Sequence, residues 1–322
     1  MDSLNEIKKV IKKSKSIALF THISQDCDAL GSTFGLALAL KKLGKNVQIF
    51  LKEDFTDEQK PLFDENSISK ERCEISDFDL FICCDLSSLN RLGDYSYIFD
   101  GKNKTICLDH HICQKFIGKY NYIDSESSSC CEIVYKLIKK LNVRIDSEIA
   151  TKLYTGLDTD TSSFRNTNTN SNSLLTAYYL LEYGANIKKI NQVLYQSYSL
   201  KDIDFQKYLY NNFKIKNDCA YITLTYNQLK SLNGNKEDCS SYSRNLVNIK
   251  GINYSFSLIE NEPNEYKLSM RSKVGYDVRE ITASLGGGGH SCAAGATINA
   301  KNIDEALKIV LIKIEEIKTN KI

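Results

Sequence analysis

Short apolar runs alternate with helical patterns through the first half of the chain. Residues 16–20, 79–84 and 105–108 are apolar without polar alternation, which is typical of strands buried on both faces of a parallel sheet. Apolar positions recur at helical spacing over 29–43, and a further strand is predicted at 47–51. Strands and helices that alternate in this way predict an α/β domain with a doubly wound, mainly parallel sheet.

More helices are predicted at residues 128–141, 146–157 and 172–183. Beyond residue 184 the pattern changes, and alternating runs at 220–226, 254–260 and 265–271 precede a final amphipathic helix at 302–317. A polar, helix-like stretch separates the two patterns. We therefore expect a first domain at 1–185, a helical connector at 186–211 and a smaller α+β domain at 212–322.

Composition narrows the class of protein. The 322 residues carry a formal net charge of +2, so no overall field favours long duplex DNA or an anionic membrane as partner. No apolar run reaches the roughly 18 to 20 residues that span a bilayer. The 11 cysteines form no Cys-x-x-Cys pair and no secretory leader precedes them, which favours reduced thiols and a cytoplasmic location. Whether the chain forms a homodimer stays open.

Polar side chains that can bind metals follow three of the predicted strands. They are His22, Asp26 and Asp28 after the first, Asp85 after the second, and Asp109, His110 and His111 after the third. The carboxyl ends of parallel strands meet at one edge of a sheet, so we expect these groups to converge. Asp158 and Asp160 form a fourth acidic cluster after a helical pattern.

The residue types indicate a transition-metal site. Three of the four histidines lie in these clusters, and imidazole with carboxylate suits Mn, Fe, Co or Zn better than Mg or Ca. Asp26 and Asp28 lie two positions apart, so each can face a different ion while Asp85 bridges them. Two ions about 3.5 to 4 Å apart clamp the attacking and departing oxygens of phosphoryl transfer. Taken singly, Asp28 could instead be a helix N-cap, and Asp85 or Asp158 a turn residue.

A second constellation is the glycine-rich run LGGGGHSCAAGA at 285–296. Packing does not call for four consecutive glycines, whereas close approach of main-chain N–H groups to an anion does. His290 would add a donor, and Arg271 upstream offers a guanidinium suited to a phosphate. The alternative is a flexible loop.

The motifs resemble those of a known family in content and order. They are His22-x-x-x-Asp26-x-Asp28-x-x-Gly31-Ser32, then Asp85, Asp109-His110-His111, Thr159-Asp160-Thr161 and Gly287-Gly288-Gly289-His290-x-x-Ala293-Ala294-Gly295. This order resembles the DHH phosphoesterases with a C-terminal DHH-associated domain. Size and motif order are most similar to the bacterial nanoRNase and pAp-phosphatase (oligoribonuclease) branch, and the resemblance covers nearly the whole chain.

The resemblance implies a role for each motif. His22 and Asp26 would hold one Mn-type ion, Asp28, His110 and Asp160 the second, and Asp85 would bridge the pair. Asp109 would orient a ligand histidine, and His111 would reach the scissile phosphate or the leaving oxygen. Substrate phosphate would be held by Arg271, Gly287, Gly288, Gly289 and His290.

The implied activity is Mn-dependent hydrolysis of short oligoribonucleotides and linear dinucleotides such as pApA and pGpG to mononucleotides, and of pAp to AMP and phosphate. One alternative is a cyclic di-AMP phosphodiesterase, which would use the same metals. A second, an inorganic pyrophosphatase, is disfavoured by the glycine motif, which is typical of the nucleotide-binding type. A third, a nucleotide-binding sensor, is disfavoured by the full set of expected ligands, since a sensor would tolerate the loss of some. The chain departs from the family pattern at Ser162, where glycine is common, and at Cys27, where Gly, Ala or Pro is commoner. Neither change removes an expected ligand.

Overall fold

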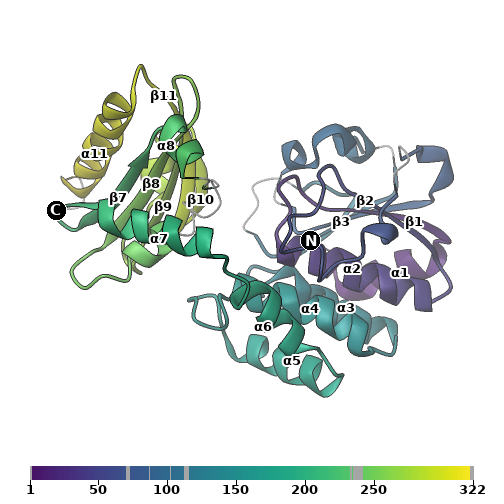
Figure 1. Ribbon diagram of the computed structural model, residues 1–322. Helices are drawn as coiled ribbons and strands as arrows, with labels where there is room; N and C mark the ends of the chain where they lie inside the picture. Colours follow the sequence, from purple (N-terminus) through teal and green to yellow (C-terminus); the bar gives the residue numbers. More distant parts are fainter. Residues whose placement is uncertain are drawn as a thin grey trace. The chain divides into compact units, whose positions relative to one another are not determined.

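A computed structural model describes residues 2–69, 73–86, 88–101, 103–111, 116–232, 234 and 242–319. The chain divides into two compact units, Met1–Ser197 and Tyr198–Ile322. Each unit has a sheet of its own (Figure 1). No helix in the described ranges is both long enough and apolar enough to cross a membrane. The cysteines that the structure describes are free thiols, and most of them are buried.

The sheet of the first unit is parallel throughout. Its strands are β1 (Ser16–Phe20), β2 (Asn46–Phe50), β3 (Leu80–Cys84), β4 (Thr105–Asp109) and β5 (Tyr120–Ile123). They lie in the order β2-β1-β3-β4-β5, and every neighbouring pair is parallel. The predicted doubly wound α/β fold is confirmed. The chain passes from β1 to β2 on one side of β1, and then from β2 to β3 on the other side of β1. The topological switch point therefore falls between β1 and β3.

Side chains of the strands alternate between two cores. On one face, Leu19, Ile82 and Leu108 pack into a core shared with the helices α1 (Leu4–Lys13), α2 (Cys27–Lys42), α3 (Cys130–Leu141) and α4 (Ser147–Asp160). On the other face, Phe20 and Phe81 pack against Phe78 and against buried residues of the 3-10 segment η3 (Leu89–Phe99). Two further 3-10 segments, η1 (Glu65–Ser67) and η2 (Ile75–Asp77), contain no buried residue. Both faces are therefore covered, which explains why these strands are apolar without alternation.

Helices α2 and α4 approach each other closely through glycines. A Cβ at Gly31 would lie 2.5 Å from the backbone oxygen of Lys152, and one at Gly156 would lie 2.8 Å from Cα and Oδ1 of Asp28. Real Cβ contacts are not this short, so both positions need glycine. The close packing brings the carboxyl end of α4 alongside the first turn of α2.

The stretch predicted as one connector is shared between the units. Helices α5 (Ser171–Glu182) and α6 (Ile187–Tyr195) complete the first unit, and Ile190 of α6 is buried in its core. Helix α7 (Leu200–Asn212) belongs to the second unit, where Phe205 and Leu209 are buried. The division between the units thus falls between α6 and α7, inside residues 186–211.

The second unit is a mixed sheet between two layers of helices. Its strands are β6 (Lys214–Lys216), β7 (Cys219–Leu224), β8 (Tyr254–Glu262), β9 (Glu265–Ser272), β10 (Gly288–His290) and β11 (Ala293–Asn299), in the order β10-β11-β9-β8-β7-β6. Only β7 and β8 pair in parallel. Helices α7 and α8 (Tyr226–Ser231) pack on one face, and α10 (Arg279–Ala283) and α11 (Ile303–Thr319) on the other (Figure 1). The α+β expectation is confirmed.

Candidate metal centre

The candidate site lies where three neighbouring strands of the first unit end. His22 follows β1, Asp85 directly follows β3, and Asp109 is the last residue of β4. The Oγ1 of Thr21 donates a hydrogen bond of 2.9 Å to the carbonyl oxygen of Cys84, which ties the ends of β1 and β3 together. The sequence clusters therefore converge at the switch point of the sheet, where α/β folds bind their ligands.

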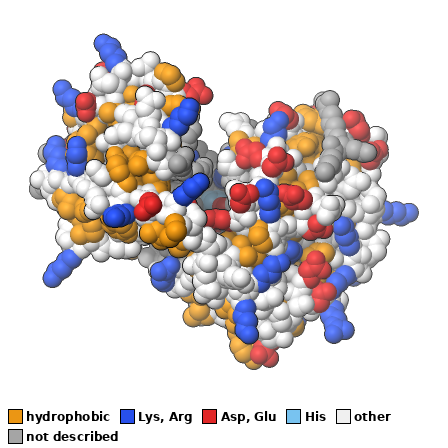
Figure 2. Space-filling model, in the orientation of Figure 1, with side chains coloured by type: hydrophobic (Ala, Val, Ile, Leu, Met, Phe, Trp, Pro, Cys, Tyr) orange, Lys and Arg blue, Asp and Glu red, His pale blue; other side chains and the backbone are white. Residues whose placement is uncertain are grey.

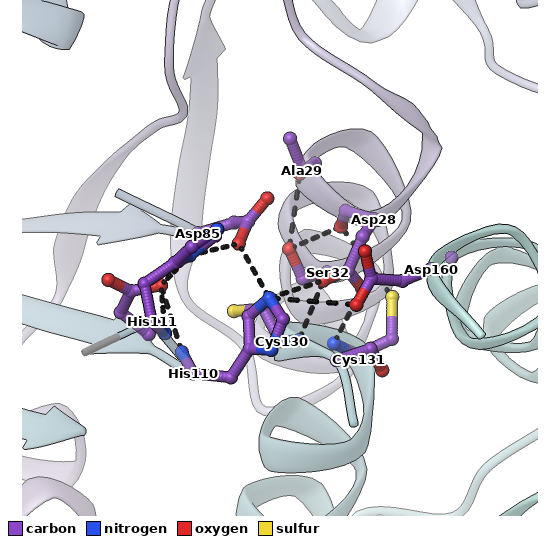
Figure 3. Close-up of polar contacts among 12 residues, drawn as sticks. Asp28, Ala29, Ser32, Asp85, His110, His111, Cys130, Cys131 and Asp160 are labelled. Atoms are coloured by element: carbon purple, nitrogen blue, oxygen red, sulfur yellow. Dashed lines mark hydrogen bonds and ion pairs between the residues drawn. The ribbon is translucent and has the colours of Figure 1, made fainter. Parts of the chain in front are cut away.

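Asp85 occupies the middle of the site, and its two oxygens face different histidines. Oδ2 lies 3.4 Å from Nε2 of His22. Oδ1 lies 3.5 Å from Nε2 of His110 and 3.4 Å from Nδ1 of His111 (Figure 3). The residue is buried and has a φ of +57°, a left-handed conformation that Asp tolerates better than most residues.

Asp26, not Asp28, caps helix α2. Oδ1 of Asp26 accepts hydrogen bonds of 3.0 Å from the backbone N–H groups of Asp28 and Ala29. Its Oδ2 lies 3.9 Å from Nε2 of His22, so one carboxylate both caps the helix and faces the site. The interpretation of Asp28 as the cap is wrong because the helix begins at Cys27, two residues earlier than predicted.

Asp28 is buried and is held by a second helix. Its Oδ2 accepts from the N–H of Cys130 at 2.7 Å and its Oδ1 from the N–H of Cys131 at 2.9 Å, the first two residues of α3 (Figure 3). The positive end of that helix favours a carboxylate here. Oδ2 also lies 3.9 Å from Nε2 of His110.

The two aspartates at the end of α4 differ in their surroundings. Oδ2 of Asp160 lies 3.7 Å from Nε2 of His110, within the site (Figure 3). Asp158 instead accepts a hydrogen bond of 2.5 Å from the hydroxyl of Tyr195 on α6. The helical pattern did not separate the two, but the family resemblance had named Asp160 and not Asp158 as an expected ligand.

The ligand atoms form two main groups of three. His22, Asp26 and Asp85 make one, and Asp28, His110 and Asp160 make the other; within each group the atoms lie within 4.8 Å of one another. Asp85, His110 and His111 form a third such group. The Oδ1 of Asp85 is buried with no hydrogen-bond partner among the described residues. A buried, unpartnered carboxylate oxygen among imidazoles fits divalent cations of the Mn, Fe, Co or Zn type.

Burial and mutual repulsion act on these carboxyls. Burial, with the charges of Asp85 and Asp160, raises the pKa of Asp28 well above its usual range. Burial and the neighbouring Asp85 also raise the pKa of Asp160 to about 6, although His110 opposes the shift. Burial acts in the same direction on Asp85, but the surrounding imidazoles outweigh it and lower its pKa. Bound cations would relieve the repulsion that raises the first two.

Asp109 contacts the imidazole of His111, and it contacts His110 only through the backbone N–H of that residue. Its buried Oδ1 accepts hydrogen bonds from Nδ1 of His111 at 2.8 Å, from the N–H of His110 at 2.8 Å and from the N–H of His111 at 3.2 Å. Burial lowers the pKa of His111, but the bond to Asp109 and the charge of Asp85 outweigh it and raise that pKa to about 9. The imidazole is therefore protonated at neutral pH.

Sequence reasoning missed Arg91, which lies on η3. Its Nη2 is 2.8 Å from Nδ1 of His22. No periodicity marks this residue, because η3 is an irregular segment that changes direction at Gly93. Its place near the site depends on the hydrogen bond of 2.8 Å from the N–H of Ile23 to its carbonyl oxygen.

In the second unit, Arg271 and the glycine motif share one sheet. Arg271 on β9 pairs with Ala293 on β11, which pairs in turn with His290 on β10. Burial and the neighbouring Arg244 lower the pKa of Arg271 to about 10, so the guanidinium remains charged at neutral pH. Arg244 is a second cation that the sequence did not indicate. The side chain of His290 lies outside the described part of the chain.

The interpretation that packing does not require the glycines is wrong for two of them. A Cβ at Gly287 would collide with the carbonyl oxygen of Gly295, and one at Gly289 would lie 2.5 Å from Cα of Ala294. These two glycines allow β10 to lie against β11. Gly288 has nothing within 4 Å of its Cβ position, so its backbone is open to a ligand.

Comparison with known proteins supports the same division of the chain. The DHH family, N-terminal domain, matches residues 16–157, and the DHHA1 domain matches residues 220–316. The chain belongs to the DHH family. The first match contains the candidate ligands from His22 to His111, and the second contains Arg271 and the glycine motif.

Relatives align with nearly the whole length of this chain. A protein of Mycoplasma genitalium named bifunctional oligoribonuclease and PAP phosphatase NrnA is 28% identical over 97% of this chain and 98% of its own length. A Bacillus subtilis protein of the same name is 26% identical over 95% and 96%. A crystal structure of an exopolyphosphatase-related protein from Bacteroides fragilis matches 98% of this chain and 96% of its own, with a TM-score of 0.90 and 26% identity. The nanoRNase branch predicted from the motifs is confirmed.

Proposed function

We propose that the protein is a phosphoesterase with two divalent metal ions that hydrolyses short oligoribonucleotides and linear dinucleotides to mononucleotides, and pAp to AMP and phosphate. The observation that carries this proposal is the position of Asp85, whose two oxygens face different groups of possible ligands. Such an arrangement suits a shared ligand of two ions. The names of the full-length relatives supply the substrate class.

In this proposal the first ion is held by His22 and Asp26, the second by Asp28, His110 and Asp160, and both by Asp85. Mn²⁺ is the proposed metal because the donor set mixes imidazole with carboxylate. When bound, such ions lower the pKa of water and offset the charge of phosphoryl oxygens. Two of these carboxylates are kept in place by backbone N–H groups, Asp28 by those of α3 and Asp26 by those of α2.

His111 is the proposed proton donor to the leaving oxygen. Its Nδ1 proton is engaged by Asp109, which fixes the plane of the ring, and the imidazolium carries its second proton on Nε2. A pKa of about 9 keeps that proton in place at neutral pH until the leaving oxygen develops charge. Asp109 then stabilises the cation and positions the ring, and takes no proton itself.

Arg271 and the backbone at Gly288 are proposed to hold the substrate's terminal phosphate, with Arg244 adding positive charge. Basic and acidic side chains are both spread over the face drawn in Figure 2, in keeping with the net charge of +2. A mixed surface of this kind offers little attraction to a long polyanion, which supports short substrates. Binding of one terminal phosphate then accounts for a preference for short substrates, namely short RNA, linear dinucleotides and pAp.

The test is a comparison of initial rates on pApA, pAp, cyclic di-AMP and a longer RNA, with Mn²⁺ and after chelation. We expect Mn-dependent release of mononucleotides from pApA and of phosphate from pAp, and slower turnover of the other two. Asp85→Asn should abolish these activities, whereas Asp57→Asn, which changes an exposed carboxylate paired with Lys60, should not. Faster hydrolysis of cyclic di-AMP would favour the cyclic-dinucleotide enzyme. Nucleotide binding without hydrolysis would favour a sensor.

A further inference from the structure

The guanidinium of Arg91 lies beside the ligand group of His22, Asp26 and Asp85. It is brought there by the chain that leaves β3, while its own backbone oxygen accepts from the N–H of Ile23. The only acceptor within hydrogen-bond distance of its side chain, in the parts of the chain described, is Nδ1 of His22 at 2.8 Å. No described carboxylate lies within ion-pair distance of it.

The hydrogen bonds around His22 cannot all form at once. Nδ1 of His22 lies 2.8 Å from Nη2 of Arg91 and 2.8 Å from the carbonyl oxygen of Ile23. An arginine nitrogen only donates and a carbonyl oxygen only accepts. Nδ1 therefore either accepts from Arg91 or donates to Ile23, according to which ring nitrogen carries the proton.

Metal binding would decide between the two. The nitrogen of His22 that faces Asp85 and Asp26 is Nε2, so a ligand role requires the lone pair there and the proton on Nδ1. That proton is then donated to the carbonyl oxygen of Ile23. The side chain of Arg91 is then a half-buried cation that has no hydrogen-bond acceptor among the described residues.

We propose that Arg91 binds a non-bridging phosphate oxygen of the substrate, on the side of the site formed by His22 and Asp26. This inference rests on the proposed function and extends it. A phosphate ester supplies a hydrogen-bond acceptor in place of Nδ1 of His22, which no longer accepts once it carries the proton. A guanidinium matches phosphate geometry through two parallel N–H groups. The first unit thus contributes a phosphate ligand of its own.

The variant Arg91→Gln tests the proposal, since it removes the charge and keeps much of the side-chain volume. We expect the affinity for Mn²⁺, measured by titration calorimetry, to stay within about twofold of wild type. We expect kcat/KM for pAp and pApA to fall roughly 10- to 100-fold, the loss typical of a hydrogen bond to a charged group. Arg91→Lys should recover part of this loss, and added guanidinium should partly restore an Arg91→Ala variant.

Binding of inorganic phosphate to the Mn-loaded protein separates this inference from the proposed function. If wild type hydrolyses none of the substrates, the proposed function fails, and weaker phosphate binding by Arg91→Gln still supports the role of Arg91. If wild type is active and Arg91→Gln matches it at saturating Mn²⁺, the inference is overturned. Loss of Mn²⁺ affinity with normal turnover at saturating metal would likewise overturn it, because Arg91 would then serve only to hold His22. Circular dichroism melting checks that each variant is folded.

Discussion

The close contact between α2 and α4 offers a sharp test of how the site is built. Gly156→Ala would place a methyl group 2.8 Å from both Cα and Oδ1 of Asp28. The Cα atom belongs to a helix backbone and cannot rotate away, so α2 and α4 must separate or Asp28 must shift. Either movement disturbs the bonds from the N–H groups of Cys130 and Cys131 to the carboxylate. Gly156→Ala therefore disturbs the position of Asp28, a proposed metal ligand, without replacing any proposed ligand.

The expected effect on stability is modest, and that on metal binding is larger. Overpacking costs about 1–3 kcal/mol. Alanine in place of glycine returns about 1 kcal/mol of helix propensity, which leaves a net loss of about 0–2 kcal/mol. A disturbed charge-assisted hydrogen bond to Asp28 is worth about 1.5–3 kcal/mol. At 1.4 kcal/mol per factor of ten, Mn²⁺ affinity should fall roughly 10- to 100-fold.

Gly35→Ala is the matched control, because it lies in the same interface. The three atoms nearest to its Cβ position all belong to the side chain of Leu153, the first two at 2.7 Å and 3.0 Å, and a leucine side chain can adjust. Titration calorimetry with Mn²⁺ and urea unfolding of both variants give the two quantities. We expect Gly35→Ala to keep wild-type affinity for Mn²⁺. Equal losses in both variants, or wild-type affinity in Gly156→Ala, would refute the reasoning.

Three further predictions concern backbone strain, pH and the proton donor. Ser162 has a φ of +49°, so Ser162→Gly should relieve about 1–2 kcal/mol of backbone strain. Glycine costs about 0.5–1 kcal/mol of conformational entropy in return. Urea unfolding should therefore show a net gain in the free energy of unfolding for Ser162→Gly and none for Ser162→Ala. Burial and Asp85 raise the pKa of Asp160 to about 6, so Mn²⁺ binding measured by calorimetry should weaken as the pH falls through 6. The metal-free protein should gain stability from Asp160 over the same pH range, because the folded form binds the proton more tightly than the unfolded form. Asp109→Asn should lower the pKa of His111 from about 9, so the alkaline fall in kcat should move to lower pH, and an unchanged pH profile would count against His111 as proton donor.

The general position of the site could be predicted from sequence because it depends on local patterns. Apolar runs identify the strands, and the polar residues that follow them must meet at one edge of a parallel sheet. Helix α1 and strand β5 were not predicted, and the four residues of β5 are too few to give a clear period.

The finer contacts depend on residues far apart in the chain. Asp28 binds the N–H of Cys130, 102 residues away, and no local pattern indicates that contact. The same holds for Gly156 against Asp28 and for Gly287 against Gly295 and Ala296, since a required glycine is recognised only once its neighbour is known. The helix predicted at 128–141 contains these N–H groups, but nothing in its pattern indicates that they bind Asp28.

The left-handed backbone at Asp85 limits how this protein can change over evolutionary time. At a φ of +57°, asparagine and glycine are tolerated and most other residues add strain. A descendant that abandoned hydrolysis and kept only nucleotide binding would therefore be expected to carry Asn or Gly at this position.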